Sequence, residues 1–449
     1  MAFALGYTTR PTLSIRRRSL LTAAPDLPLL TSRGEPRLTE KGKDSIATPT
    51  AATGRREVNK AWFMAVLALT VYATISAILI VPPLLVEIAT DFDISVAVAG
   101  QLATATFAGW AVMGISGGPL SDSFGRRPVA LVCLAVLSIS VLASAFAPNL
   151  EILLGLRVLT GLGGGALPPN IVGSVSDVIS PARRARAVGA LLAIQGLASA
   201  ITVPFVAVLA DVGGWQLAFI VYGLTLAVGL LANWLWLPEA QGERVRNRVF
   251  FSRYRSLVSM RFFRVAVAVN IAQRIAFWGM ISYFAAYLIH TYGLSIGFVA
   301  LPLAISAVGQ MVGSYSASFV ANRRSRAVYI AGCTVLGGAC GFLLFGFNLG
   351  LWASVAVAAV GTGLLSITFP VLVAASTEYS GESKATGVGL MGFSNQAGGF
   401  LGAGIAGALL ASAGYVGVGY LCLGVCIVSA LLTTLFGRQF GETAGQSKG

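Results

Sequence analysis

The chain is 449 residues long, with 56% apolar and 11% charged residues, a balance outside the range of soluble globular domains. Its formal net charge of +14 could indicate nucleic-acid binding, but the basic residues fall between apolar runs rather than in one patch. The composition therefore predicts a multi-pass protein of the lipid bilayer and excludes a nucleic-acid-binding protein. All five cysteines lie inside apolar runs without metal-ligand or disulfide spacing, so no cofactor and no metal site is expected.

The N-terminal region, residues 1–60, is rich in Ser, Thr, Pro and Arg and contains no apolar run long enough to span a membrane. This composition predicts a disordered, basic cytoplasmic tail. Its first 25 residues contain four arginines and no acid, which is also typical of an organelle transit peptide. We prefer the tail, because nothing in the segment marks a cleavage site.

From residue 61 onward the chain contains twelve apolar segments of about 20 residues, the length that a membrane-spanning helix needs. The predicted spans are residues 62–84, 97–119, 128–147, 152–174, 187–210, 216–237, 265–289, 297–319, 328–347, 351–374, 387–411 and 416–436. Proline pairs at residues 82–83 and 168–169 are expected to kink the helices that contain them.

The basic residues predict on which side each turn lies. All but two of the 31 Lys and Arg residues fall in the tails, in the middle loop or in turns that follow an even-numbered span. None falls in a turn that follows an odd-numbered span. By the positive-inside rule, both termini are therefore cytoplasmic. The protein is expected in a plasma membrane or a bacterial inner membrane.

The turn after the second span, residues 118–127, concentrates glycine and charge. Its glycines allow the backbone to bend, and Asp122 can accept from helix-terminal N–H groups or pair with Arg126. The turn resembles the loop between the second and third helices of the major facilitator superfamily, and it matches that signature at six positions. These are Gly118, Leu120, Asp122, Gly125, Arg126 and Arg127. The resemblance implies that this motif gates the cytoplasmic side.

The chain repeats at an offset of 200 residues, which aligns Asn322 with Asp122 and Arg326 with Arg126. Between the two copies, residues 238–264 form a basic cytoplasmic linker with seven arginines. This pattern predicts an all-α membrane protein with twelve transmembrane helices in two pseudo-symmetric six-helix bundles, as in the major facilitator fold. The bundles are expected at residues 61–237 and 265–437, followed by a cytoplasmic tail at 438–449.

Arg157 lies several residues inside the fourth span, where a guanidinium costs on the order of 3 kcal/mol on insertion scales. It should therefore face the bundle interior or a water-filled cavity. Its surroundings resemble the fourth-helix motif that proton-coupled members link to proton transfer, although Thr160 stands where Gln is usual. Pairing with a loop acid or with backbone carbonyls is the alternative. The spacing of Gly161 and Gly165 predicts close helix packing.

Arg274 is the second buried cation, about 15 Å of helix rise beyond Arg264 and hence near mid-membrane. Asn270, Gln273 and Trp278 lie close to the same helical face, and in the facilitator fold the seventh helix lines the central cavity. We expect Arg274, Asn270 and Trp278 to contact the substrate. A structural role for Arg274 is the alternative.

No Asp or Glu lies in the middle of a predicted span. Arginine does not titrate, so proton coupling would need Glu87, Asp211, the only histidine His290, or the substrate itself, acting beside Arg157. Two buried arginines without buried acids favour an anionic or polar neutral substrate.

The fifth span resembles that of the twelve-helix drug:proton antiporter branch, although its glycine-proline signature is degraded. Gln195 in this span and Asn395, which lies 200 residues later, are expected to face each other across the cavity or to make interhelical hydrogen bonds. Trp110 is a further candidate for stacking on a planar substrate.

The resemblance covers residues 61–437 and implies a monomeric secondary transporter, not an enzyme, which exports a small organic compound by alternating access in exchange for protons. Uptake or facilitated diffusion of a metabolite is the alternative within transport. A non-transporting receptor or scaffold is the alternative of another class. A membrane enzyme is not expected, because the chain has a single histidine and no HExxH motif.

Overall fold

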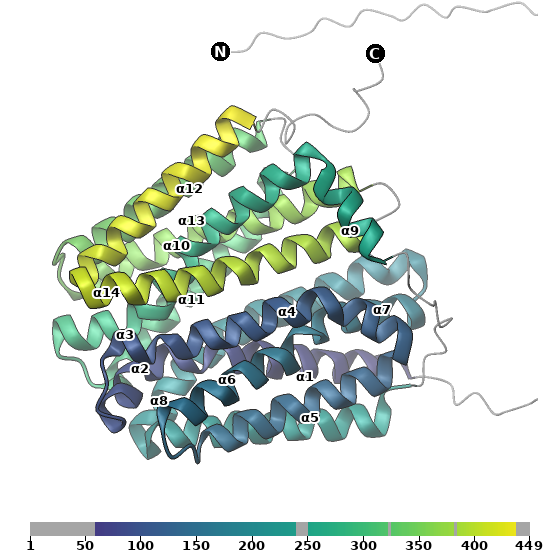
Figure 1. The fold of residues 1–449 in the computed structure, drawn as a ribbon, viewed down its shortest axis with the longest axis horizontal. Coiled ribbons are helices and arrows are strands. Elements are labelled where there is room, and N and C mark those ends of the chain that lie inside the picture. Colours follow the sequence, from purple (N-terminus) through teal and green to yellow (C-terminus); the bar gives the residue numbers. More distant parts are fainter. Residues whose placement is uncertain (1–58, 239–249, 322–324, 381–383, 437–449) are drawn as a thin grey trace, which may run out of the picture. The chain divides into compact units, whose positions relative to one another are not determined.

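The computed structural model describes residues 59–238, 250–321, 325–380 and 384–436, and all the regular structure in them is helical. The helices are α1 (Lys60–Leu79), α2 (Val81–Asp91), α3 (Val96–Ala99), α4 (Gln101–Phe124), α5 (Arg126–Ser144), α6 (Leu150–Gly165), α7 (Leu167–Val178), α8 (Pro181–Trp236), α9 (Phe250–Ser259), α10 (Arg261–Tyr292), α11 (Ile296–Ala321), α12 (Arg326–Gly346), α13 (Leu351–Tyr379) and α14 (Lys384–Phe436). The long helices lie side by side, as Figure 1 shows. The two predicted tails and part of the predicted linker lie outside the described residues.

Ten helical stretches among the described residues are long and apolar enough to cross a membrane. Two of them, α8 and α14, have twice the usual length and reverse direction at glycines. In α8 the break includes Gly214 (φ 72°), and in α14 it is Gly414 (φ 65°), a left-handed backbone region that glycine enters without strain. Each therefore contains two spans, which gives the twelve that the sequence predicts.

The first proline pair follows the end of a helix without turning the chain. α1 passes into α2 through Ile80, which keeps helical torsions (φ −63°, ψ −43°), and Pro82 and Pro83 lie in the first turn of α2, which begins at Val81. The candidate membrane span ends at Leu79, and the helical path continues outside it to Asp91, beyond the predicted end of the span at residue 84. Because proline has no backbone N–H, it leaves carbonyls in the preceding turn without a partner, which kinks the helix rather than stopping it.

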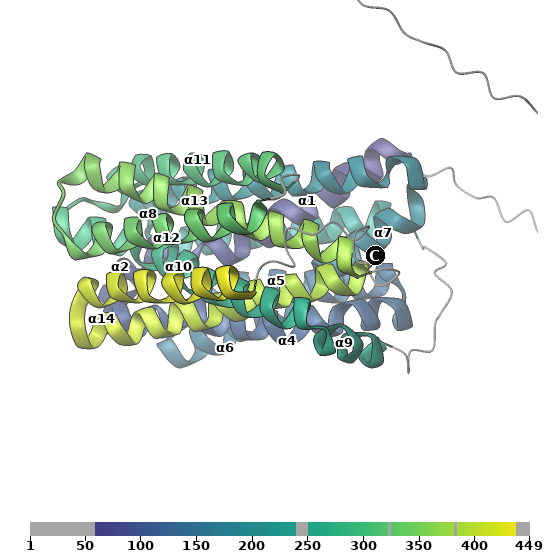
Figure 2. The ribbon, with the colours of Figure 1, turned by 90° about the horizontal axis from the view of Figure 1, so that it is seen from above.

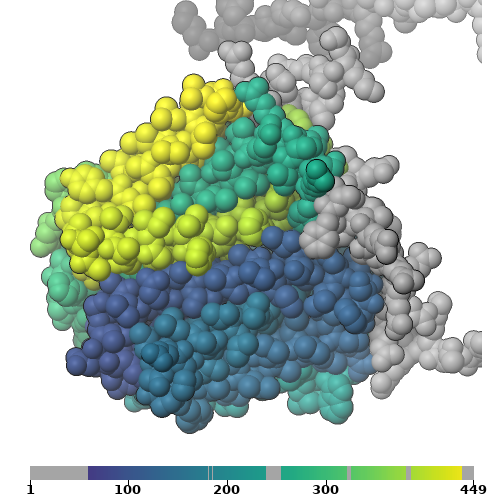
Figure 3. Space-filling view, viewed as in Figure 1, coloured from purple at the N-terminus to yellow at the C-terminus, as the bar shows by residue number. Residues whose placement is uncertain are grey.

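The helix contacts repeat between the two halves of the chain. In the first half α4 contacts α6, α5 contacts α6 and α8, and α1 contacts α8. In the second half the corresponding contacts, in the same order, are α11 with α13, α12 with α13 and α14, and α10 with α14. Between the halves, α4 contacts α14 and α8 contacts α11, and the shift of 200 residues exchanges these two pairs. Figures 2 and 3 show the second half, green to yellow, packed along the first. The pseudo-symmetric architecture predicted from the sequence is confirmed.

Small residues allow the helices of each half to approach closely. A Cβ atom on Gly165 would lie 2.6 Å from the carbonyl oxygen of Trp110, and one on Gly161 would lie 2.7 Å from the Trp110 backbone nitrogen. The predicted packing role of Gly161 and Gly165 is therefore confirmed at the contact between α6 and α4. Below, the "Asp211 end" of the helices is the end that holds Asp91 and Asp211, and the "Arg126 end" is the opposite one.

Candidate functional site

The motif at residues 118–127 is mostly helix rather than turn. α4 continues through Pro119 to Phe124 and α5 begins at Arg126, so that the turn consists of Gly125 alone. Gly125 has φ 96° and ψ 151°, which an L side chain rarely adopts. The longer turn expected from the sequence is wrong because Pro119 is tolerated inside a supported membrane helix.

Arg126 organises this corner of the molecule. Its guanidinium forms one ion pair with Asp122 one turn earlier (2.6 Å) and a second with Asp177 near the end of α7 (3.2 Å). The pairing expected for Asp122 is therefore present. The side-chain amide of Asn170 in α7 donates to the Arg126 carbonyl oxygen (2.8 Å) and to the hydroxyl of Ser121 (2.9 Å). The motif is thus tied to α7 of its own half. Sequence reasoning gave Asp177 and Asn170 no role, because 51 and 44 residues separate them from Arg126.

The neighbouring motif residues support the same corner. Arg127 donates to the backbone oxygen of Trp234 at the end of α8 (2.6 Å), and Leu120 packs against the apolar core. The second copy keeps the arginine contact: Arg326, 3% exposed, holds Glu378 of α13 through two bonds of 3.1 and 2.6 Å. Asn322, aligned with Asp122, lies outside the described residues.

Arg157 is fully buried inside the first half, at 0% exposure. Its guanidinium donates to the hydroxyl of Ser144 (2.6 Å) and lies 4.8 Å from the centre of the Phe219 ring. Nε and Nη1 have no hydrogen-bond partner, and within the described part of the chain no carboxylate pairs with this arginine. Arg157 is therefore enclosed by α5 and α8 of its own half. Thr160, which replaces the usual Gln, bonds to Ser140 (3.0 Å).

Arg274 is buried in the second half, at 4% exposure. It donates to the carbonyl oxygen of Leu365 in α13 (3.3 Å) and lies over the rings of Phe277 and Phe369, at 4.4 and 5.2 Å. Its Nε has no partner, and no carboxylate pairs with it among the residues that the structure describes. Contact with an aromatic face stabilises a cation by about 0.5–2 kcal/mol. The charge itself remains uncompensated.

The predicted neighbours of Arg274 extend from it toward the other half. Asn270, one turn before Arg274, donates to the hydroxyl of Ser394 in α14 (2.7 Å). Trp278, one turn after it, packs against Phe107 of α4, with ring centroids 4.7 Å apart. The indole N–H of Trp278 is buried and has no partner in the described chain. α10 thus carries polar groups from the core of the second half to the seam between the halves.

The sequence placed Gln273 near the face of Arg274 but gave no role to Phe107. Gln273 lies beside Arg274 and donates to the same carbonyl oxygen of Leu365, and Phe107 supplies the contact across the seam. The amide oxygen of Gln273 is buried without a partner in the described chain. Polarity in an apolar run is the signal that singled out Gln273, but an aromatic residue in a membrane helix gives no signal of this kind.

The halves also meet at the Asp211 end. Asp211 accepts a hydrogen bond from the backbone N–H of Gly297, in the first turn of α11 (3.2 Å), and Asp91 accepts from the indole N–H of Trp215 (2.9 Å). Burial, together with the charges of Asp211 and Asp91, raises the pKa of the Glu87 carboxyl, which lies beyond the predicted end of the first span. The structure therefore brings Glu87 and Asp211 together. His290 is exposed and packs beside Tyr415, with ring centroids 5.8 Å apart.

The remaining candidates lie on α8, α14 and α4. Gln195 is exposed on α8, whereas Asn395 is half-buried and donates to the neighbouring Gln396 (3.0 Å). Trp110 is 4% exposed and its ring packs on Gly164, so helix packing between α4 and α6 occupies it. A stacking contact of Trp110 with the substrate stays a prediction.

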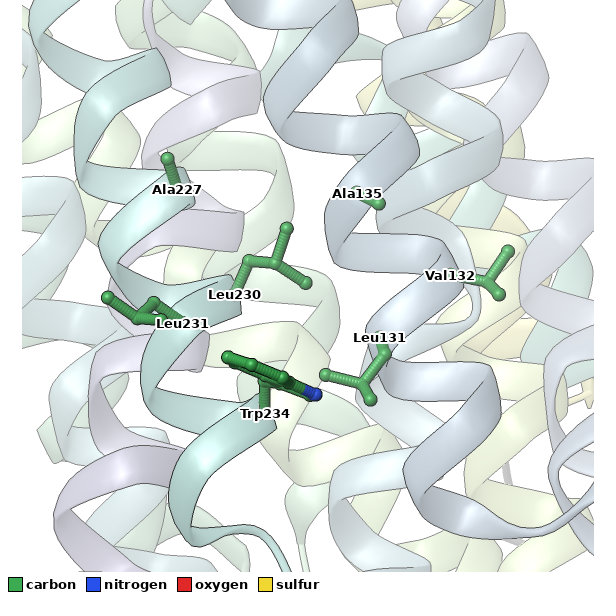
Figure 4. Close-up of a pocket in the computed structure, with 7 residues that line it drawn as sticks. All are labelled: Leu131, Val132, Ala135, Ala227, Leu230, Leu231 and Trp234. Carbon is green, nitrogen blue, oxygen red and sulfur yellow. The ribbon is translucent and has the colours of Figure 1, made fainter.

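An apolar pocket of about 430 Å³ lies between α5 and α8 (Figure 4). Leu131, Val132 and Ala135 line one side of it, and Ala227, Leu230, Leu231 and Trp234 line the other. It contains none of the predicted site residues. Among the described residues, no three His, Cys, Asp or Glu side chains are grouped so that they could hold a metal ion.

Three bacterial transporters are similar to this chain in sequence. The probable sulfoacetate transporter SauU of Cupriavidus necator is 24% identical over 351 residues, which cover 73% of this chain and 82% of that protein. The niacin transporter NiaP of Acinetobacter baylyi is 34% identical over 134 residues, or 30% of each chain. The 4-hydroxybenzoate transporter PcaK of Pseudomonas aeruginosa is 33% identical over 169 residues, 35% of this chain and 36% of its own. The last two matches therefore span about a third of each relative.

Solved structures and a family model complete the comparison. A bacterial homologue of the human lysosomal transporter Spinster has a TM-score of 0.70 at 18% identity, covering 85% of this chain and 97% of that one. A D-xylose-proton symporter has a TM-score of 0.67 at 15% identity, covering 86% and 99%. The model of the Major Facilitator Superfamily matches residues 61–364 and 271–448. With this fold, the repeated helix contacts and a family match over most of its length, the chain belongs to the major facilitator superfamily.

Proposed function

We propose that this transporter carries a small organic anion across the membrane by alternating access, with a binding site beside Arg274. The observation that carries the proposal is a guanidinium at 4% exposure without a carboxylate partner in the described chain. It lies one helical turn from Trp278, which meets Phe107 across the seam. An anionic group of the substrate would supply the missing counter-charge.

The names of the relatives support an acidic substrate. Sulfoacetate, niacin and 4-hydroxybenzoate each carry an acid group that is ionised at neutral pH, although two of these matches cover only a third of the chain. None of these names supports the drug:proton antiporter branch or the efflux that the sequence suggested. We therefore prefer the alternative, uptake of a metabolite.

Uptake of an anion requires electrical work. An anion that enters a cell moves against an inside-negative potential, which costs about 2.3 kcal/mol per charge for each 100 mV. A co-transported cation would offset this cost, and we propose protons. Glu87 and Asp211 remain the candidates for proton binding, because both lie near the contact between α8 and α11. Arg157 is enclosed by its own half, so we propose that its role is structural.

The topology follows from the charges. We propose that the Arg126 end is cytoplasmic, since the even-numbered turns hold the basic residues, and that the halves are bundles 61–237 and 265–437 joined by the linker at 238–264. The contacts of Asp211 with Gly297 and of Phe107 with Trp278 would then close the external side in this structure. The pairs of Arg126 with Asp122 and Asp177 would rearrange when the cytoplasmic side closes.

The test is uptake into proteoliposomes. Labelled sulfoacetate, nicotinate and 4-hydroxybenzoate are offered with an inward proton gradient, and neutral xylose serves as the reference compound. Arg274→Gln removes the buried charge, whereas Arg183→Gln removes an exposed one from the first turn of α8 and serves as the matched control. We expect gradient-driven uptake of at least one anion in the wild type and in Arg183→Gln, with a loss of at least about tenfold in Arg274→Gln.

Other outcomes separate the alternatives. Anion uptake that persists at full rate in Arg274→Gln would refute the binding site. Uptake without a gradient would support facilitated diffusion, and transport of xylose alone would exclude an anion carrier. No movement of any compound in correctly folded protein would favour the receptor hypothesis.

A further inference from the structure

The short helix α9 lies where a membrane span begins. It covers Phe250–Ser259, and the candidate span of α10 starts two residues later, at Arg261. Figures 1 and 2 both show α9 at the same end of the molecule as α7, which carries Asp177. A helix at this level has to be compatible with lipid headgroups as well as with water.

The inward face of α9 is set by packing. Leu257 is 4% exposed and belongs to a buried cluster with Phe263, Leu390 and Met391. The hydroxyl of Tyr254 lies against Gly389 of α14, where a Cβ atom would be 2.7 Å from it. The rotation of α9 about its axis is therefore determined, and so is the face that points away from the protein.

The outward side of α9 and of the first turn of α10 combines apolar and cationic side chains. Val258 and Met260 are 45% and 41% exposed, and Arg255 in α9 and Arg261 and Arg264 in α10 are exposed as well. The guanidinium of Arg261 lies 5.3 Å from the ring of Phe436, a contact that leaves its positive charge in place. We call these five residues the α9 surface.

No acid neutralises this surface from nearby in the sequence. Between Arg244 and Thr377 the chain contains no Asp or Glu, and the flanking acids are Glu243, which lies outside the described residues, and Glu378, which Arg326 binds. Arginines alone would suit any anion, including free phosphate. Exposed Val258 and Met260 between them also need an apolar phase, which only the boundary between headgroups and acyl chains provides.

We infer that the α9 surface docks the headgroups of anionic phospholipids. Each basic residue at an anionic membrane surface contributes about fivefold in affinity, so three arginines together contribute on the order of a hundredfold. The effect should weaken as salt is raised, because exposed charges are screened. Because Tyr254 and Leu257 contact α14, a bound lipid would also stabilise that end of the second half.

The experiment measures lipid binding by the full-length protein in detergent micelles. Phosphatidylglycerol is compared with phosphatidylcholine, by native mass spectrometry of bound lipid and by the shift in melting temperature. The test variant replaces Arg255, Arg261 and Arg264 with Gln. The matched control replaces Arg183, Arg184 and Arg186, three exposed arginines at the start of α8, in the same way.

We expect phosphatidylglycerol binding to fall on the order of a hundredfold in the test variant and to change less than about twofold in the control. A variant with Lys at the same three positions should retain most of the binding. If the Gln variant does not fold in phosphatidylcholine micelles, Arg255→Gln alone should still weaken binding about fivefold. Equal binding by the test variant and the wild type, equal losses in test and control variants, or no preference of the wild type for phosphatidylglycerol would each overturn the inference.

Discussion

The contact between α10 and α14 makes a sharp prediction about one glycine. Gly402 of α14 faces the backbone of Ile275, the residue after Arg274, and a Cβ atom there would lie 2.6 Å from the carbonyl oxygen and 3.0 Å from the Cα atom. Normal van der Waals contact is about 3.5 Å. All of these neighbours are backbone atoms, so no side chain can rotate away. Gly402→Ala would therefore push the two helices apart.

The size of the effect follows from two opposing terms. Overpacking of a closely packed contact costs about 1–3 kcal/mol. Alanine in place of glycine inside a helix returns up to about 1 kcal/mol, so the net destabilisation should be about 1–2 kcal/mol. Gly392, in the same helix, has no atom within 4 Å of its Cβ position. Gly392→Ala should therefore be neutral or stabilise by up to about 1 kcal/mol.

The assay is thermal unfolding of both variants and the wild type in the same detergent. We expect the melting temperature of Gly402→Ala to be lower by a few degrees and that of Gly392→Ala to be unchanged or slightly higher. Equal shifts in the two variants would show that α10 and α14 are not in backbone contact at this position. The position of Arg274 on α10 would then lose its support as well.

Three further predictions concern charges at the two ends. Asp122→Asn removes one of the two acids that hold Arg126, so we expect slower uptake in proteoliposomes with unchanged insertion; an unchanged uptake rate would exclude a role in the transport cycle. Glu87 has a raised pKa in the folded protein, so its ionisation destabilises the fold as the pH rises above the ordinary value near 4.5. Glu87→Gln should therefore flatten the fall of melting temperature with pH, and an unchanged slope would contradict this. Asp211→Asn weakens a hydrogen bond to Gly297 that contributes about 1 kcal/mol. A cysteine placed at the seam between the halves should therefore react roughly fivefold faster with a water-soluble thiol reagent in this variant than in the wild type. Equal reaction rates would show that this hydrogen bond does not hold the two halves together.

The features that depend on a single segment of the chain could be predicted from the sequence. Apolar length predicted twelve spans, and the breaks of α8 and α14 at Gly214 and Gly414 fall in the gaps between the predicted spans. Both buried arginines were recognisable because a charge inside an apolar run is costly wherever the run packs. The offset of 200 residues predicted the second copy, and Arg326 does hold an acid of α13, as Arg126 holds one of α7.

Only the tertiary structure decided which side chains meet. Asp177 pairs with Arg126, Phe107 with Trp278, and Asp211 with the N–H of Gly297, and each pair joins different helices. A helix that is apolar on every face contains no periodic signal for its rotation, so its sequence does not reveal which residues point at a neighbour. That rotation is set by close backbone packing, as at Gly161 and Gly402, where the absence of a side chain fixes how two helices fit together.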